Sequence, residues 1–318
     1  MARGTSPANA RGALLALTAF AIYSTHDVVV KFLGADYSPF QLVFFSTLFG
    51  FPVVTVMLMT DRIDGNLRPR HPWWVLLRTA ASVVTTAAAF YAFSVLPLAQ
   101  TYAIIFASPL LITLLAIPML GETVGWRRSV AVAIGLVGVL VVLRPGATDL
   151  GAGHLAALAA AICSAFAAVI IRKVGAEERS AVLLLYPMMA NFLIMACAMP
   201  FVYRPMPALH LGGFGLIAVF AFVAALFHIA AYRNASAIVV APMQYSQMLW
   251  AVIYGVIFFD ETPDWSTAIG SVIIIASGIY VVLREETVSK NRPVLRTQTR
   301  YLMGTIPRIG ALLRFRRR

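Results

Sequence analysis

Three residues able to carry charge stand close together inside a long apolar stretch near the start of the sequence: His26, Asp27 and Lys31. Asp27 and Lys31 are four residues apart, so on a helix they share one face and can form an ion pair. Charge inside hydrocarbon is costly. The set is therefore either a neutralised structural pair, with Lys31 reaching toward water, or a coupling or gating site for ions, protons or substrate. The sequence leaves both interpretations open.

Uncharged polar and aromatic side chains form a second candidate set. Gln244 and Gln247 are about one helical turn apart and stand beside Tyr245 and Trp250. A helix carrying them presents a face that can stack on a flat polar ligand and form hydrogen bonds with it. Amides in hydrocarbon can equally hold helices together, and the sequence does not decide. The remaining candidates for substrate binding lie in other apolar stretches and are Arg78, Tyr102, Ser108 and Asn191.

Arg78 has two interpretations of its own. It follows the pair Trp73 and Trp74 and has no acidic residue within one helical turn. Its side chain either reaches back to lipid headgroups or faces a cavity, where the planar guanidinium suits an electronegative group.

The patterns expected of an enzyme or a metal site are missing from the sequence. The five histidines are scattered, and no H-E-x-x-H, G-x-S-x-G or nucleotide-binding glycine loop occurs. Cys163 and Cys197 are far apart in apolar runs, which is typical of small core residues rather than a disulfide or a thiolate metal site. The sequence predicts a protein that is not an enzyme and has no metal and no cofactor.

The elements that position these residues are predicted to be membrane helices. Of the 318 residues, 60% are hydrophobic and 12% are charged, whereas soluble domains are about half apolar and about a quarter charged. A helix that crosses a bilayer needs about 20 mainly apolar residues. Runs of that kind are found at 12–33, 39–60, 73–95, 99–119, 127–144, 152–172, 181–201, 210–231, 237–258 and 264–283. The sequence therefore predicts an all-α integral membrane protein with ten transmembrane helices.

The distribution of lysine and arginine predicts the orientation, because these residues collect on the cytoplasmic side. Placing the N-terminal segment 1–11 inside puts most of them on that side, including those of the basic tail 286–318. Both termini are therefore predicted to be cytoplasmic. The tail is interpreted as disordered or as lying on the anionic inner leaflet, and not as a nucleic-acid-binding segment.

Part of the sequence occurs twice, once at 98–144 and again at 237–284. Gly121-Glu122-Thr123 matches Asp260-Glu261-Thr262, and Trp126 matches Trp265. In both copies the glutamate precedes an expected helix start, so we interpret Glu122 and Glu261 as acids that cap a helix and complement its dipole, with Pro263 in the first helical turn.

The duplication divides the chain into two repeats, 12–144 and 152–285. Because each repeat holds five predicted helices, an odd number, the second must enter the bilayer from the opposite face. Inverted repeats are typical of secondary transporters, whose halves rock about a binding site between them. Pro109 and Pro242 lie in corresponding helices and permit kinks there. We interpret these two prolines as parts of the gating or cavity-lining helices.

The two five-helix copies, the helix of Pro109 ending in Gly121-Glu122 and the second copy ending in Asp260-Glu261 resemble the drug/metabolite transporter superfamily, EamA type. The resemblance covers about residues 10–285. Within that superfamily, FAIYSTHDVVVKFLGADYSPFQLVFFS, AFYAFSVLPLAQTYAIIFASPLL and APMQYSQMLWA are similar to segments of bacterial riboflavin importers. Met248 departs from the pattern, because it stands where Pro109 predicts a proline.

The resemblance implies a secondary transporter of the bacterial inner membrane that moves a small, aromatic and neutral metabolite by alternating access. Riboflavin uptake is the leading expectation, because riboflavin is flat, neutral and edged by amide-like groups that suit amides beside aromatic rings. An exporter of amino acids or related metabolites in the same fold is the alternative. The expected partners are the small-molecule substrate and the lipid bilayer; the oligomeric state is left open.

Overall fold

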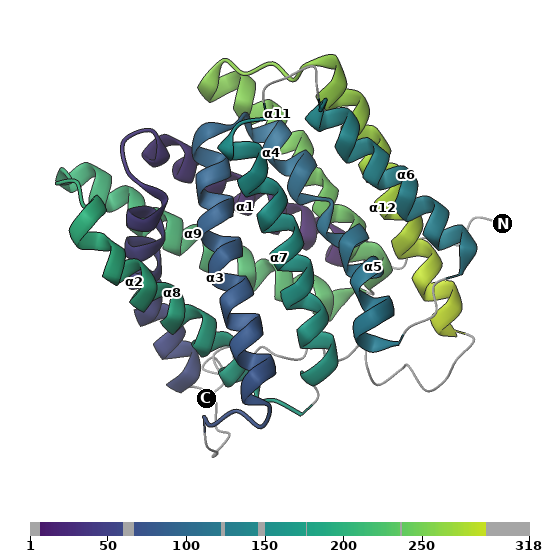
Figure 1. The fold of residues 1–318 in the computed structure, drawn as a ribbon, viewed down its shortest axis with the longest axis horizontal. Helices are drawn as coiled ribbons and strands as arrows, with labels where there is room; N and C mark the ends of the chain where they lie inside the picture. Colours follow the sequence, from purple (N-terminus) through teal and green to yellow (C-terminus); the bar gives the residue numbers. More distant parts are fainter. Residues whose placement is uncertain are drawn as a thin grey trace.

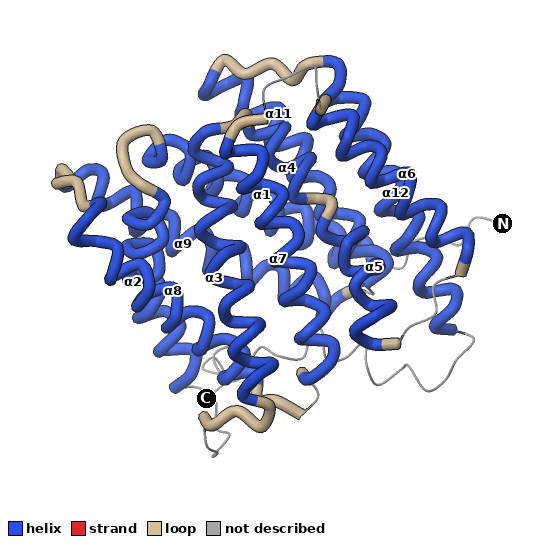
Figure 2. The backbone as a smooth tube through the Cα atoms, in the orientation of Figure 1, coloured by secondary structure: helices blue, strands red, loops and turns tan. Residues whose placement is uncertain are grey.

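The computed structural model describes residues 7–59, 67–121, 125–145, 150–175, 177–235 and 237–290. In these ranges the chain is helical, with connecting turns and no β-strand (Figure 2). Six described helical segments, one of which (Leu98–Leu120) joins two consecutive helices, are long and apolar enough to cross a membrane, and three further apolar helices are shorter. The predicted helix-capping residue Glu122 and the tail beyond residue 290 lie outside the described residues.

The helices are numbered in chain order, and all but α10 and the short 3-10 helix η1 are labelled in Figure 1. They are α1 (Pro7–Gly34), α2 (Pro39–Met59), α3 (Pro72–Val95), α4 (Leu98–Ile105), α5 (Ser108–Leu120), α6 (Trp126–Leu143), α7 (Ala152–Val174), α8 (Ser180–Val202), α9 (Ala208–Asn234), α10 (Ala237–Val240), the short 3-10 helix η1 (Ala241–Tyr245), α11 (Ser246–Phe259) and α12 (Trp265–Lys290).

Two of the predicted continuous helices are interrupted in the structure. The run 99–119 is divided at Phe106 and Ala107 into α4 and α5, and Pro109 stands in the first turn of α5. The run 237–258 is divided into α10, η1 and α11, with Pro242 in η1. Proline lacks the amide hydrogen and crowds the preceding turn, so both interruptions occur where that effect is expected.

The helices pack as two bundles that each contain helices from both halves of the chain. The α1 bundle consists of α1, α9, α10, η1 and α11; the α7 bundle consists of α3, α4, α5 and α7. In Figure 1, α3 and α7 run side by side through the middle of the molecule. Two further pairs, α6 with α12 and α2 with α8, complete the fold.

Corresponding residues of the two halves occupy matching places. Gly121 ends α5 and Asp260 ends α11, both with left-handed backbone at φ 67° and 52°. Gly12 of α1 lies against Ala235, where an added Cβ would come within 2.3 Å of the alanine Cβ. Gly153 of α7 lies in the same way against Leu96, where an added Cβ would come within 2.9 Å of the leucine Cγ. Only glycine permits these close approaches.

The α6 and α12 pair is built on small residues. A Cβ on Gly138 would lie 3.0 Å from the carbonyl oxygen of Gly270, and one on Gly270 would lie 2.7 Å from the Gly138 carbonyl oxygen. The buried Ser277 hydroxyl donates to the Ala131 carbonyl at 2.5 Å. Small residues let helix backbones approach closely, which explains why these two helices run together along their length (Figure 1).

The prediction that Glu261 caps the last helix is wrong. Helix α12 begins at Trp265, and the side chain of Asp264 accepts a hydrogen bond from the Thr267 amide at 2.9 Å, the geometry of an N-cap. Pro263 accordingly precedes the cap rather than occupying the first turn. Glu261 stands three residues before the cap, which leaves its carboxylate available to another part of the molecule.

Candidate functional site

Asp27, Tyr102 and Gln247 come together from three helices that are far apart in the sequence. The Tyr102 phenol on α4 donates to the Asp27 carboxylate on α1. The Gln247 amide on α11 donates to the Tyr102 oxygen at 3.4 Å. Tyr102 and Gln247 are buried at 4% and 8% exposure, and the Asp27 side chain is 14% exposed. The three residues form a polar chain inside an otherwise apolar region, named below the Asp27 cluster.

The neighbours of Asp27 on α1 extend the cluster. His26 Nδ1 lies 2.7 Å from the second oxygen of Asp27, and the imidazole meets the Phe90 ring edge to face at 6.1 Å between centroids. The Ser24 hydroxyl is buried close to the Tyr102 phenol without a well-aligned hydrogen bond. The Asp27 carboxylate is thus bound by a phenol and an imidazole.

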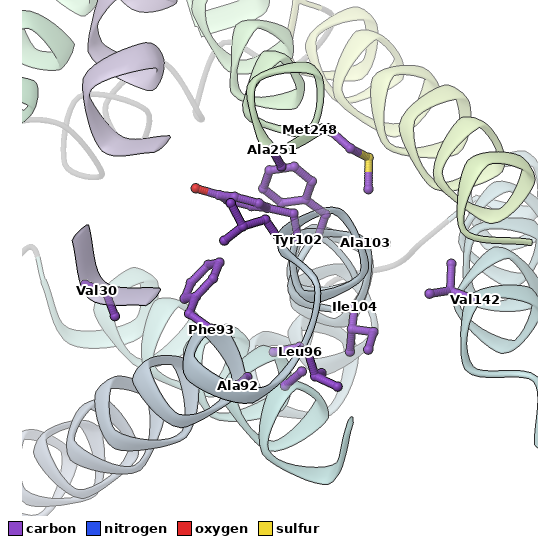
Figure 3. Close-up of a cluster of buried hydrophobic side chains, with 14 of the residues drawn as sticks. Val30, Ala92, Phe93, Leu96, Tyr102, Ala103, Ile104, Val142, Met248 and Ala251 are labelled. Atoms are coloured by element: carbon purple, nitrogen blue, oxygen red, sulfur yellow. The ribbon is translucent and has the colours of Figure 1, made fainter. Parts of the chain in front are cut away.

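Aromatic rings enclose the Asp27 cluster. Tyr102 packs between Phe93 and Phe106, with centroid distances of 5.2 Å and 5.5 Å. Figure 3 shows the Tyr102 and Phe93 rings next to each other, with the Tyr102 hydroxyl pointing away from Ile104. The arrangement of rings around hydrogen-bonding groups suits a flat ligand that carries both apolar faces and polar edges.

Trp250 and Tyr254 form a stacked aromatic pair on α11. Their centroids are 5.8 Å apart with an interplanar angle of 28°. The Tyr254 hydroxyl lies 3.1 Å from Thr25 Oγ1 on α1, two residues before Asp27. Trp250 is therefore connected to α1 through Tyr254, at a position close to Asp27 in the sequence but on another face of the helix.

Lys31 does not pair with Asp27, although the spacing permits it. The Lys31 ammonium lies 2.5 Å from Glu261 Oε1 and donates to the Leu96 carbonyl at 2.5 Å. Because the Asp27 oxygens are bound by Tyr102 and His26, each of the two opposite charges on α1 is held by a different partner. The expected pair within one helix is replaced by contacts between helices.

The other predicted residues of the 3-10 helix and of α5 stand outside the Asp27 cluster. Tyr245 is buried in the core, edge-on to Phe106 at 5.5 Å, and its hydroxyl lies where a Cβ on Gly278 would be. Gln244 is half-buried beside it in η1. The Ser108 hydroxyl bonds the Ile105 carbonyl at 2.7 Å and contacts the Ser164 hydroxyl at 3.0 Å. Ser108 therefore joins α5 to α7.

Asn191 and Arg78 lie on α8 and α3. An Arg78 guanidinium nitrogen donates to the Leu183 carbonyl of α8, and its Nε is buried without a hydrogen-bond partner. Asn191 is buried, and its carbonyl oxygen has no partner. Because α8 packs mainly on α2 and α3, these two residues are separate from the Asp27 cluster.

A cavity of about 170 Å³ lies between the turn that joins α3 to α4, helix α11 and the residues that precede α12. Its polar lining includes Gln100, Glu261, Asp264 and Thr267. Among the described residues, no group of three or more His, Cys, Asp or Glu side chains could hold a metal ion.

Sequence reasoning missed the contact residue Thr25 and assigned Glu261 to a helix end. Thr25 gives no signal by itself, because single threonines are common in membrane helices. For Glu261 a signal existed, since a glutamate repeated beside an apolar helix needs a counter-charge, and Lys31 is a cation in the other repeat.

Comparisons with known proteins match the helical region as a whole. The sequence profile described as the EamA-like transporter family fits residues 10–144 and again residues 151–284. The fold also matches a protein of known crystal structure, with a TM-score of 0.58 and 18% sequence identity. The matched region covers 90% of this chain and 99% of the other chain, so the two proteins share a fold.

Three characterised relatives carry different transport activities in their names. The S-adenosylmethionine uptake transporter of Rickettsia bellii is 26% identical over 273 residues, which cover 83% of this chain and 90% of the relative. The pseudopaline exporter of Pseudomonas aeruginosa is 25% identical over 276 residues, covering 84% and 94%. The riboflavin transporter of Vibrio cholerae is 25% identical over 290 residues, covering 88% and 95%.

Proposed function

This chain belongs to the EamA-like transporter family, and we propose that it is a secondary transporter that moves a small aromatic metabolite across the bacterial cytoplasmic membrane by alternating access. Members of the family are transporters, so the protein is a membrane transporter and not an enzyme.

The proposed topology has ten membrane crossings in two inverted halves, with both termini in the cytoplasm. The contact pattern supports an internal two-fold relation, because α1 packs on α9 as α7 packs on α3, and α6 pairs with its own counterpart α12. The matching helix ends at Gly121 and Asp260 support it as well. Inverted halves place the binding site between the bundles.

The observation that carries the proposal is the Asp27 cluster. It joins α1 and α11 of one bundle to α4 of the other through Asp27, Gln247 and Tyr102. A buried ionisable group inside a membrane protein marks a functional site by default. Residues at this junction bind substrate and change their exposure when the bundles move against each other.

Riboflavin uptake is the first substrate candidate. The isoalloxazine ring is flat and has an imide edge that can donate to Asp27 and accept from Gln247, while the stacked pair Trp250 and Tyr254 offers an aromatic surface. The riboflavin transporter among the relatives supports this candidate.

A positively charged aromatic metabolite is the second candidate, and the Asp27 carboxylate favours it. A cation placed between Asp27 and the surrounding rings gains both charge pairing and cation–π contact. The S-adenosylmethionine uptake transporters among the relatives support this chemistry, since that compound joins a sulfonium to an adenine ring. Export of an amino-acid-like compound, as in the pseudopaline exporter, differs from both in direction.

Asp27 and His26 are also the proposed coupling residues. Their 2.7 Å contact lets a proton move between the imidazole and the carboxylate, and Tyr102 connects that pair to Gln247. Arg78 and Asn191 lie apart from the Asp27 cluster, where α3 packs on α8. They stay proposed substrate contacts only for a ligand that extends to this place.

A competition assay tests the proposal. Labelled riboflavin and labelled S-adenosylmethionine are each offered to flavin-auxotrophic bacteria that express the protein, with an excess of each panel compound, amino acids included. Saturable uptake of one label, reduced only by its own unlabelled form and close analogues, identifies the substrate. If neither label accumulates and cells are instead protected against toxic amino-acid analogues, the export alternative replaces uptake.

A further inference from the structure

Lys31 and Glu261 together hold the turn between α3 and α4. The Lys31 ammonium donates to the Leu96 carbonyl at 2.5 Å, and Glu261 Oε2 accepts the Leu98 amide at 3.1 Å. The two side chains contact each other at 2.5 Å. One cation and one anion of the α1 bundle thus bind an acceptor and a donor two residues apart in the backbone of the α7 bundle.

The surroundings of this contact are closely packed. A Cβ on Gly34, one turn after Lys31, would lie 2.4 Å from the Ser94 Cβ on α3, so α1 and α3 touch backbone to side chain at this point. The Lys31 ammonium also lies 5.1 Å from the centre of the Phe259 ring. Lys31 and Glu261 are 10% and 23% exposed, which shields their interaction from water.

In the part of the chain that the structure describes, the contact that corresponds to this one in the other half is much smaller. Under the two-fold relation, α1 against α3 corresponds to α7 against α9. Helix α1 packs on α3, whereas α7 and α9 have at most marginal contact in the described part of the chain. In the described residues the close approach of α1 to α3 at Gly34, beside Lys31, has no counterpart of similar extent between α7 and α9, as expected of a transporter that is closed at one end.

We propose that Lys31 and Glu261 form a releasable clamp that closes one end of the transport path by gripping the backbone of Leu96 and Leu98. The role rests on the proposed alternating access. Glu261 lines the cavity beside the turn, so water or an arriving solute reaches the carboxylate from outside the clamp. When this end opens, both backbone contacts break and the two side chains remain with the α1 bundle.

The clamp differs from an ordinary ion pair in a way that a charge swap detects. In the double variant K31E/E261K the two charges still attract each other, but residue 31 has no donor for the Leu96 carbonyl and residue 261 has no acceptor for the Leu98 amide. A structural ion pair is restored by the swap, whereas the clamp is not.

The test measures access to a reporter cysteine between α1 and α11 next to the Asp27 cluster, Thr25→Cys, after Cys163 and Cys197 are replaced by alanine. An impermeant maleimide is applied to each face of oriented membrane vesicles. We expect Glu261→Gln and Lys31→Met to speed labelling from the clamp side roughly tenfold or more, the effect of losing charge-assisted hydrogen bonds. Asp264→Asn is the matched control, because it disrupts the nearby but exposed ion pair between Arg144 and Asp264 and should leave labelling unchanged.

The charge swap then decides between the two accounts. If the reporter cysteine of K31E/E261K is labelled as fast as that of the single variants, the clamp is supported. If its labelling is as slow as in the wild type, the clamp is overturned. Labelling of Glu261→Gln at the wild-type rate would overturn it as well. Labelling does not depend on which substrate is carried. If the clamp variants open while the wild type carries no panel compound, the proposed substrates fail and the clamp remains.

Discussion

The Tyr102 phenol donates a hydrogen bond to the Asp27 carboxylate, although 75 residues separate them in the chain. The bond joins α4 to α1 across the boundary between the two bundles. Any motion that separates the bundles at this level must break or remodel it. The bond therefore places substrate binding and conformational change at one position, and the predictions below examine that connection.

Replacing Tyr102 by phenylalanine keeps the ring between Phe93 and Phe106 but removes the donor to Asp27 and the acceptor for Gln247. We expect the KM for transport to rise about 10- to 100-fold, because hydrogen bonds to charged groups contribute ~1.5–3 kcal/mol. The control is Tyr37→Phe, which removes a hydroxyl bound to His210 at 2.7 Å outside the cluster. Equal KM values for Tyr102→Phe and Tyr37→Phe would show that the Tyr102 hydroxyl has no role in substrate binding.

Asp27→Asn tests proton coupling. If Asp27 carries the coupling proton, uptake by the wild type changes with external pH and uptake by the variant does not, while membrane insertion and the elution profile in detergent stay normal. The control is Asp36→Asn, which removes an exposed carboxylate just after the same helix. This variant should retain the wild-type pH profile. A pH profile that survives in Asp27→Asn assigns the carboxylate to substrate binding or structure alone.

Gly34→Ala should destabilise the closed end. The new Cβ would lie 2.4 Å from the Ser94 Cβ, and forced overpacking typically costs ~1–3 kcal/mol. We expect a lower thermal unfolding midpoint in detergent and faster labelling of the Thr25→Cys reporter from the clamp side. Ser94→Gly added to Gly34→Ala should reverse both effects, because it removes the atom that clashes. Gly212→Ala, where no atom lies within 4 Å, should change neither.

Asp264 offers a pH test outside the membrane helices. Its hydrogen bonds with Thr267, aided by Arg144, lower the pKa of the carboxyl from its ordinary value of 3.8. A carboxyl with a lowered pKa stabilises the folded state above its ordinary pKa, and that contribution is lost as the pH falls through the lowered value. Asp264→Ala should therefore unfold more easily than the wild type at pH 7, by about 1 kcal/mol for a lost N-cap. The difference should shrink in acid, and Asp264→Asn should lose less, because asparagine still caps. Thermal unfolding of the three proteins across pH measures this.

The sequence predicted the all-helical structure because apolar length and proline are local signals, and the count of ten transmembrane helices stays a prediction. The two predicted runs are divided at Pro109 and Pro242, where the missing amide hydrogen and the crowding ring favour an interruption. The close packing of α6 on α12 likewise depends on small residues, because Gly138 and Gly270 let the two backbones approach and Ser277 bonds the Ala131 carbonyl. These features depend on neighbours in the chain and on side-chain size.

The partners of the charged residues were not predictable in the same way. Spacing on one helix suggests Asp27 for Lys31, but the actual partner, Glu261, is 230 positions away, and only the packing of α11 against α1 brings it there. Glu261 was taken for a helix cap because its repeat motif precedes a helix, whereas the cap is Asp264. Gln247 was selected for its amide and Tyr102 for its hydroxyl, and only the fold brings the two into contact.

The central claim is that the Asp27 cluster is the substrate site of a transporter, and counterflow in proteoliposomes tests it most directly. Vesicles holding purified protein are preloaded with unlabelled riboflavin or unlabelled S-adenosylmethionine, and entry of the matching label is followed without any ion gradient. We predict transient accumulation of one label with the wild type and at least tenfold slower entry with Asp27→Asn, the loss expected when a buried charged contact is removed. Equal accumulation by the two proteins would contradict the claim.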